Sequence, residues 1–288
     1  MDFIISRRQM LKLGAGAAML GLAGCGSSSD GGSDAAATDD VTQLTFEPGK
    51  LTVATGNPAW EPWVMNDDPE SGEGFEAALV YALAEQMGFA KEDVVWVRTD
   101  FGEAFAPGEH DWDLNIQQVS ISEERQAAVD FSPAYFTPTQ AVIVSKGGKY
   151  ENATSCADLA DAVFAVMTGT TADTFIMDSI TNGSKENIRY YNDNVDAATD
   201  LKNQQIDALV TDTPQCVYMV ESGQTGDSLV VGQIPGSSDA GLGMTLAKDS
   251  PLTPFVTDAM NAILDDGTVQ GLIDQWLAAY TSDIPTLA

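Results

Sequence analysis

From Leu51 onward, short apolar runs alternate with longer amphipathic stretches, which is the pattern of β–α units. Phe75–Met87 carries an apolar residue at every fourth position and is followed by Gly88, so we expect a helix that ends there. We expect strands at Leu51–Ala54, Val94–Val97, Leu114–Val119, Ala141–Val144, Val163–Met167, Ile188–Tyr191, Ala208–Val210 and Leu242–Leu246. We expect further helices at Thr171–Ile180, Val195–Lys202, Pro214–Glu221, Pro251–Leu264 and Thr268–Tyr280. No period of about 20 to 50 residues repeats, so the predicted fold class is mixed α/β and not a solenoid.

Turn-forming residues interrupt this pattern at Phe131–Pro138 and again at Gly232–Gly241. These two interruptions indicate places where the fold changes unit, and they predict two α/β lobes. Periodicity alone does not determine whether the chain passes between the lobes twice.

Residues 1–25 have the features of an export signal. Arg7 and Arg8 precede the apolar stretch Leu11–Ala23, which is shorter than the roughly 20 apolar residues of a membrane span. Ser6–Lys12 resembles the twin-arginine export motif, and an ordinary Sec signal with two arginines is the alternative. Either reading predicts an exported protein.

Leu22–Cys25 resembles a bacterial lipobox, in which the thiol of Cys25 is diacylglycerated after cleavage. Two acyl chains provide durable membrane anchoring where one is marginal. The segment 26–45 that follows is rich in Gly, Ser, Ala and Asp, a composition typical of a flexible tether. We therefore expect a protein held by lipid on the outer face of the cell membrane.

The composition excludes several functional classes. The chain has 288 residues with 43 Asp and Glu against 13 Lys and Arg, a formal net charge of −30, which makes nucleic acid an improbable partner. A single His, with only Cys156 and Cys216 beyond the signal, leaves too few ligands for a zinc or iron–sulfur site, and we expect no metal or cofactor. The sequence leaves open whether these two cysteines form a disulfide.

Four local patterns could bind a small molecule. Ser120–Arg125 places an arginine one turn from a helix start, where a guanidinium can bind a carboxylate in bidentate fashion; a surface arginine paired with a glutamate is the alternative. Thr168–Asp173 joins a strand to a helix whose N-terminus offers N–H donors, or it is a plain capped helix start. Asp212 follows a buried strand, where it serves a ligand or caps the next helix; since Thr213 and Pro214 form a cap and a first helical position, it is available for the former. The fourth pattern is Trp60, a packing residue or a stacking platform between two prolines.

With these motifs in this order, the chain resembles the solute-binding proteins of polar amino-acid ABC transporters, which have the type II periplasmic-binding fold. The matching segments are Leu51–Gly56, Trp60–Trp63, Gly74–Glu76, Ser120–Arg125, Val129–Tyr135, Gly169–Thr171, Asp207–Asp212, Asp266–Thr268 and Trp276–Tyr280. The resemblance implies one lobe made of residues 46–138 and 239–288, a second of 139–238, and hinge strands near 137–141 and 236–241 that let the lobes close on a ligand.

The resemblance also implies roles for single residues. Arg125 would bind the ligand α-carboxylate with help from the backbone at Ser120 and Thr171. Asp212 would bind the α-ammonium, assisted from Ser120 and Gln118. Trp60 would stack on the ligand side chain. The full set of predicted ligand-binding residues is Trp60, Gln117, Gln118, Ser120, Arg125, Met167, Thr170, Thr171 and Asp212.

The chain departs from the family pattern in its pocket. Gly56 stands where many relatives carry an aspartate that can bind cationic side chains, and Gln117 and Gln118 replace small residues. These differences favour a polar ligand that is uncharged or acidic, and not one of dipeptide size.

The resemblance implies an ABC permease and an ATPase as partners of a monomeric receptor without enzymatic activity. Two alternatives stay open. Some relatives with this fold are dehydratases or glycan-cleaving lyases, and a binding protein can also be the sensing subunit of a membrane signalling system. Turnover of a candidate substrate would distinguish an enzyme from a receptor.

Overall fold

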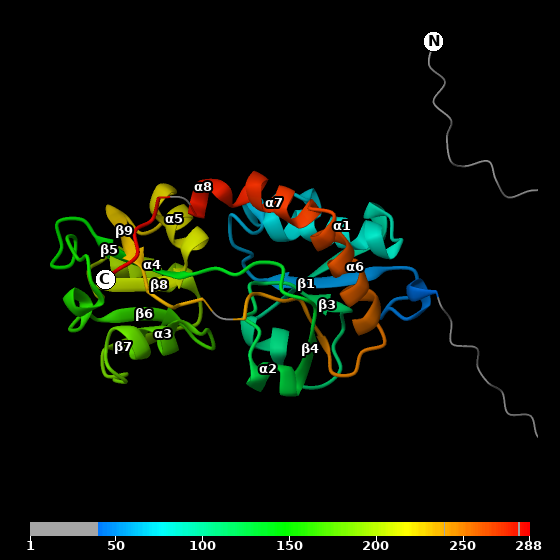
Figure 1. The fold of residues 1–288 in the computed structure, drawn as a ribbon, viewed down its shortest axis with the longest axis horizontal. Helices are drawn as coiled ribbons and strands as arrows, with labels where there is room; N and C mark the ends of the chain where they lie inside the picture. The colour runs from blue at the N-terminus through cyan, green and yellow to red at the C-terminus, as the bar shows by residue number, and fades with distance from the viewer. Residues whose placement is uncertain (1–39, 239, 282) are drawn as a thin grey trace, which may run out of the picture. The chain divides into compact units, whose positions relative to one another are not determined.

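The structure is a computed structural model that describes residues 40–238, 240–281 and 283–288. Two five-stranded sheets organise these residues into two lobes, each with helices on its faces (Figure 1). The predicted two-lobed α/β fold is confirmed. The predicted signal, the lipidated Cys25 and most of the predicted tether lie outside the described residues. Among those residues, no helix is long and apolar enough to cross a bilayer.

The first lobe is built on a sheet with strand order β2-β1-β3-β10-β4. Its strands are β1 (Leu51–Gly56), β2 (Val94–Thr99), β3 (Leu114–Asn115), β4 (Val129–Phe131) and β10 (Thr245–Ala247), and its helices are α1 (Phe75–Met87), α2 (Glu123–Ala128), α6 (Thr253–Asp265) and α7 (Thr268–Trp276). Strands β2, β1 and β3 are parallel, whereas β10 is antiparallel to both neighbours. The apolar faces of α1, α6 and α7 bury Trp63, Phe75 and Leu79 against the sheet.

The second lobe repeats this plan with strand order β7-β6-β8-β5-β9. Its strands are β5 (Gln140–Ser145), β6 (Phe164–Met167), β7 (Ile188–Tyr191), β8 (Ala208–Asp212) and β9 (Ser228–Gln233), and its helices are α3 (Ala172–Ser179), α4 (Asn194–Lys202) and α5 (Thr213–Glu221). Both faces of this sheet are buried, and two separate apolar clusters cover them. Short 3-10 helices lie at Val41–Gln43, Met65–Asp67, Pro69–Ser71, Lys91–Asp93, Phe101–Phe105 and Cys156–Leu159.

The chain crosses between the lobes three times. The first crossing leads from β4 into β5 and the second from β9 into β10, and residues Phe136 and Leu242 of the two crossings form an antiparallel bridge. Helix α8 (Ala278–Thr281) then leads back towards the second lobe (Figure 1). There Thr286 pairs with Gln233 and Leu287 is buried in the second core.

The last crossing differs from the expected boundary, which assigned residues 239–288 to the first lobe. Residues 284–288 belong with the second sheet, because the Gln233 N–H donates to the Pro285 oxygen and the Leu287 N–H donates to the Gln233 oxygen. The Cys156 N–H also donates to the Ala288 oxygen. No local pattern marks a strand at these residues, and the pairing arises only when the second sheet is complete.

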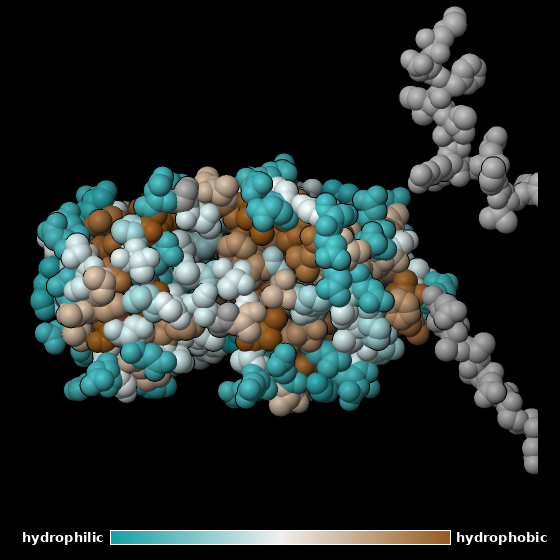
Figure 2. All heavy atoms as spheres, viewed as in Figure 1, coloured by the Kyte–Doolittle hydropathy of each residue, from teal (hydrophilic) through white to brown (hydrophobic). Residues whose placement is uncertain are grey.

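Several elements differ in extent from those the sequence predicts. The strand expected at Leu114–Val119 ends at Asn115, and the backbone then turns through Gln118, whose φ is 56°. The helix expected at Thr268–Tyr280 is divided into α7 and α8, and β9 was not predicted. Cys156 and Cys216 are free buried thiols, so no disulfide joins them. Figure 2 shows hydrophilic residues distributed over both lobes, as the composition requires.

Candidate functional site

A cavity of about 650 Å³ lies between the two lobes. The first lobe lines it with residues 55–60, with Asp100, Phe101, Gly102 and Phe105, and with the turn that follows β3. The second lobe contributes the starts of α3, α4 and α5. All nine residues predicted to bind the ligand lie on its wall, namely Trp60, Gln117, Gln118, Ser120, Arg125, Met167, Thr170, Thr171 and Asp212. Their contact with a ligand stays a prediction.

Arg125 projects from the first turn of α2 and is 8% exposed. Its Nη1 donates to the Ser120 carbonyl at 2.7 Å, and its Nη2 donates to the Gly169 carbonyl of the second lobe, also at 2.7 Å. The guanidinium carbon lies 4.4 Å from the ring centroid of Phe105, a cation–π distance. Because backbone oxygens and an aromatic face fix its position, the cation is held at the cavity in one orientation.

Asp212 ends β8 on the opposite lobe and is 9% exposed. Gln140 Nε2 donates to its Oδ1 at 2.5 Å. Asp212 occupies the N-cap position of α5, yet its side chain makes no capping hydrogen bond. The predicted cap at Thr213 is therefore displaced by one residue, while the expectation that the carboxylate is not used for capping is confirmed.

The start of α3 faces the same cavity. Gly169 adopts φ +81°, and Thr170 Oγ1 donates back to the Met167 carbonyl at 2.8 Å, which forms the tight turn. Thr171 is the N-cap residue, and its side chain makes no capping hydrogen bond. The first N–H groups of a helix have no acceptor within the helix, so they present donors and a partial positive charge to the cavity.

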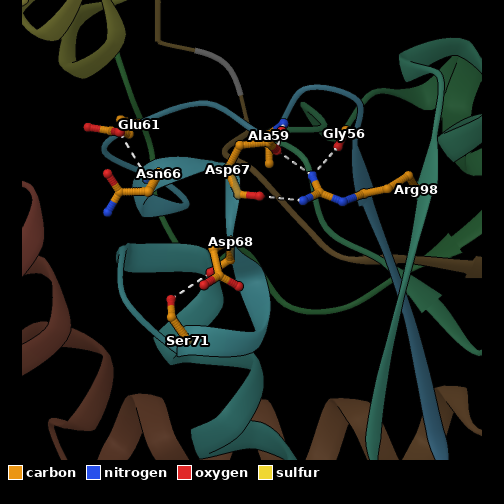
Figure 3. Close-up of polar contacts among 8 residues, drawn as sticks. All are labelled: Gly56, Ala59, Glu61, Asn66, Asp67, Asp68, Ser71 and Arg98. Carbon is orange, nitrogen blue, oxygen red and sulfur yellow. Dashed lines mark hydrogen bonds and ion pairs between the residues drawn. The ribbon is translucent and has the colours of Figure 1, made fainter.

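A cluster of polar contacts fixes the loop that carries Trp60 (Figure 3). Arg98 Nη1 lies 2.6 Å from Asp67 Oδ1 and also donates to the Gly56 carbonyl at 2.8 Å. Asp67 Oδ1 accepts in addition from the Ala59 N–H at 2.8 Å. Arg98 therefore ties the end of β2 to both ends of the loop.

Glu76 supports the turn after β3 from behind. It is fully buried, and its carboxylate accepts hydrogen bonds from the Gln118 N–H, from Gln118 Nε2 and from the Tyr135 hydroxyl. Burial raises its pKa from 4.5 to about 7, although the three donors oppose this change. Because the Gln118 N–H and Nε2 both donate to Glu76, this side chain could give the predicted assistance to the ligand ammonium only through its oxygen Oε1.

Sequence reasoning missed several residues of the wall, including Phe105, Gln140, Asn194 and Gln215. The buried Asn194 Oδ1 and Gln215 Nε2 make no hydrogen bond within the described part of the chain. Both residues belong to helix starts that follow strands of the second sheet, the same signal that pointed to Thr171. His110 stacks on Trp112 and does not line the cavity.

Each sheet contains one strand that is antiparallel to its neighbours, and the cavity lies between the two lobes. A comparison of the sequence with known protein families agrees with this architecture. Residues 51–279 match the family model described as bacterial extracellular solute-binding proteins, family 3. The chain belongs to this family. The match spans both lobes and all nine predicted site residues.

Individual members resemble the chain at modest identity. A probable histidine-binding protein of Neisseria gonorrhoeae is 25% identical over 267 residues, which are 90% of this chain and 91% of that protein. The L-cystine-binding protein of Escherichia coli strain K12 is 26% identical over 244 residues, covering 84% and 88% of the two chains. Among solved structures, an ancestral arginine-binding protein bound to arginine has a TM-score of 0.66 at 28% identity, covering 80% of this chain and 99% of that one.

Proposed function

We propose that this protein is an extracytoplasmic receptor that binds an amino acid between its lobes. The observation that carries the proposal is the placement of a buried cation, Arg125, and a buried carboxylate, Asp212, on opposite lobes of one cavity. An amino acid carries the complementary pair of charges on two substituents of one carbon atom, so a single small molecule can engage both lobes at once.

The start of α3 adds to the binding of the carboxylate. Arg125 and the first N–H groups of α3 both favour an anion, and the bond from Arg125 to Gly169 holds these two elements together. The ammonium would be bound by Asp212. Exposed ion pairs contribute at most about 1 kcal/mol, whereas charge-assisted hydrogen bonds in a dry site contribute roughly 1.5–3 kcal/mol each. Two or three such bonds with the stacking of Trp60 are sufficient for micromolar affinity, about −8 kcal/mol.

We further propose that the receptor is exported, anchored through lipid at Cys25, and monomeric, and that it delivers its ligand to an ABC permease and ATPase. Support comes from the signal-like residues 1–25, the lipobox-like Leu22–Cys25 and the extracellular family to which the chain belongs. We expect Cys25→Ser to move the protein from the membrane fraction to the soluble fraction. We also expect deletion of the gene to abolish uptake of the labelled ligand, and re-expression to restore it.

The binding proposal is tested by a thermal-shift panel of the common amino acids, followed by calorimetric titration. A ligand at 100 times its Kd adds about 2.7 kcal/mol of stability, which is readily measured. We expect one or a few amino acids to raise the melting temperature and to be recovered chemically unchanged. Absence of a shift with every amino acid would overturn the proposal, and chemical conversion of the bound compound would favour an enzyme.

A further inference from the structure

The side chain of Gln117 is held in one orientation at the cavity wall. Its Nε2 donates to Thr99 Oγ1 and to Asn115 Oδ1, both at 3.0 Å, and Asn115 Nδ2 donates to the same Thr99 oxygen at 3.0 Å. All three residues are buried, with Asn115 fully so. A closed triangle of hydrogen bonds therefore occupies the space behind Gln117.

The opposite amide orientation is unfavourable. With Gln117 reversed, Asn115 would have to reverse as well, and two acceptor oxygens would then compete for the single hydroxyl proton of Thr99. One pair of oxygens would remain in contact without a hydrogen between them. A buried acceptor without a donor is strongly unfavourable, so the observed orientation is fixed by its neighbours.

This orientation turns Gln117 Oε1 towards Gly56. The oxygen lies 3.4 Å from where a Cβ on Gly56 would be, and both residues line the cavity. Within the described residues, no protein group donates a hydrogen bond to Oε1. The same Cβ would lie only 2.9 Å from the Pro58 carbonyl oxygen, so glycine lets the loop backbone pass here, and Oε1 is a fixed, neutral acceptor on the cavity wall.

The charges on the wall complete the argument. Of the described residues that line the cavity, Arg125 carries the one positive charge, against the carboxylates of Asp100, Asp193 and Asp212. If Arg125 binds the α-carboxylate, a second carboxylate on the ligand has no cation to meet and would face the lone pairs of Oε1. A group that donates an N–H has the opposite, favourable interaction.

We propose that Gln117 determines specificity, accepting a hydrogen bond at Oε1 from an N–H of the ligand side chain. The ligand class is then amino acids whose side chains end in a carboxamide, imidazole, guanidinium or ammonium group, and not in a carboxylate. This inference rests on the proposed amino-acid binding. It departs from the preference for an uncharged or acidic ligand that the sequence favoured, because it excludes acidic side chains and includes cationic ones.

The test is calorimetric titration of the purified exported chain with glutamine, glutamate, asparagine, aspartate, histidine, arginine and lysine, and with the aliphatic amino acid leucine. We expect at least one N–H donor to bind, and the acidic amino acids to bind at least roughly 100-fold more weakly than the best of them. In Gln117→Met, which keeps the length of the side chain but removes the acceptor, we expect affinity for that ligand to fall by roughly tenfold. The matched control is Gln205→Met on the exposed surface of the second lobe, which should change nothing.

A second variant, Gln117→Glu, distinguishes a contact between Gln117 and the ligand from a purely structural role of Gln117. An anionic acceptor at this position should raise the affinity for cationic side chains relative to the neutral carboxamides. Melting temperatures of both unliganded variants within a few degrees of the parent show that they are folded. Tightest binding of glutamate, aspartate or an aliphatic amino acid would overturn the inference and leave the proposed function standing. Failure of every amino acid to bind would overturn the proposed function first.

Discussion

The two lobes differ in how firmly their polar groups at the cavity are held by neighbouring residues. In the first lobe, Arg125 is fixed by a backbone carbonyl and an aromatic ring, and Gln117 is fixed by a triangle of hydrogen bonds. In the second lobe, Asn194 Oδ1 and Gln215 Nε2 are buried without a partner among the described residues. Preorganised groups lose little entropy on binding, whereas unsatisfied groups gain most when a partner arrives. We therefore expect the first lobe to select the ligand and the second to respond to it.

The largest effect is expected when the two opposite charges, Arg125 and Asp212, are removed in separate variants. We expect Arg125→Ala and Asp212→Ala each to lower affinity by at least roughly 100-fold, because the ligand group that faces the removed side chain would be buried without its counter-charge. Calorimetric titration measures the loss. Arg189→Ala, an exposed arginine of the second lobe that donates to the Gln205 carbonyl, is the control and should bind normally. Unchanged binding in both charge variants would eliminate the clamp.

The role of the buried Glu76 in the first lobe can be tested by measuring stability as a function of pH. The pKa of Glu76 in the folded protein is about 7, above the 4.5 of an ordinary glutamate, so the folded state holds a proton that the unfolded state releases. Stability contributed by this group is fully present below pH 4.5 and declines as the pH rises towards 7. The shift corresponds to about 3 kcal/mol.

Denaturant titrations between pH 4.5 and 8 measure this decline in the parent and in Glu76→Gln. The variant keeps an acceptor for the Gln118 N–H and the Tyr135 hydroxyl, and reversal of the Gln118 amide can satisfy its new donor. We expect its stability to lack the decline. An identical pH dependence in the two proteins would contradict the assignment of the buried proton to Glu76.

The second lobe depends on the end of the chain in a way the first does not. Leu287 is 3% exposed within the second core, so Leu287→Ala should lower the free energy of unfolding by about 2 kcal/mol. Thr286→Ala, an exposed neighbour that pairs only through its backbone, is the matched control. Thermal unfolding followed by calorimetry distinguishes them. Equal stability of the two variants would mean that the second core is complete without this segment.

The smallest effect is expected at the loop of Trp60. Arg98 and Asp67 are partly exposed, so Arg98→Ala should cost about 1 kcal/mol of binding, or a few-fold in Kd, through a looser loop. Lys50→Ala removes an ion pair of similar exposure, with Asp93, at a distance of 2.7 Å and outside the cavity wall. We expect normal affinity in that control. A loss of affinity shared by both variants would indicate general electrostatics instead of loop order.

Local sequence signals predicted the alternation of strands and helices, and the family resemblance predicted the nine residues that lie on the cavity wall. These predictions succeed because the ligand-facing positions of an α/β sheet follow its strands directly, as Thr171 and Asp212 do. Features that depend on partners distant in sequence were not predictable. Arg98 binds a loop 31 residues away, and Gln140 contacts Asp212 across 72 residues. Neither contact leaves a periodic or local mark.

The same dependence on residues distant in sequence explains why some strands and helices differ in length from those predicted. Strand β3 is short because the backbone turns at Gln118, which adopts a left-handed conformation. This conformation is unfavourable for a residue other than glycine, and the buried Glu76 stabilises it by accepting from the Gln118 N–H. The final segment joins the second sheet only through edge pairing with β9, an element that was itself not predicted.

The third crossing has a mechanical consequence for the family's hinge motion. Two neighbouring connections define an axis about which two bodies can rotate freely, but a third connection away from that axis acts as a tether of fixed length. Residues 283–288 are seated in the second lobe by Leu287, whereas α7 belongs to the first. If the lobes open as the resemblance implies, wide separation would stretch the chain between them, and we expect this connection to limit how far they open.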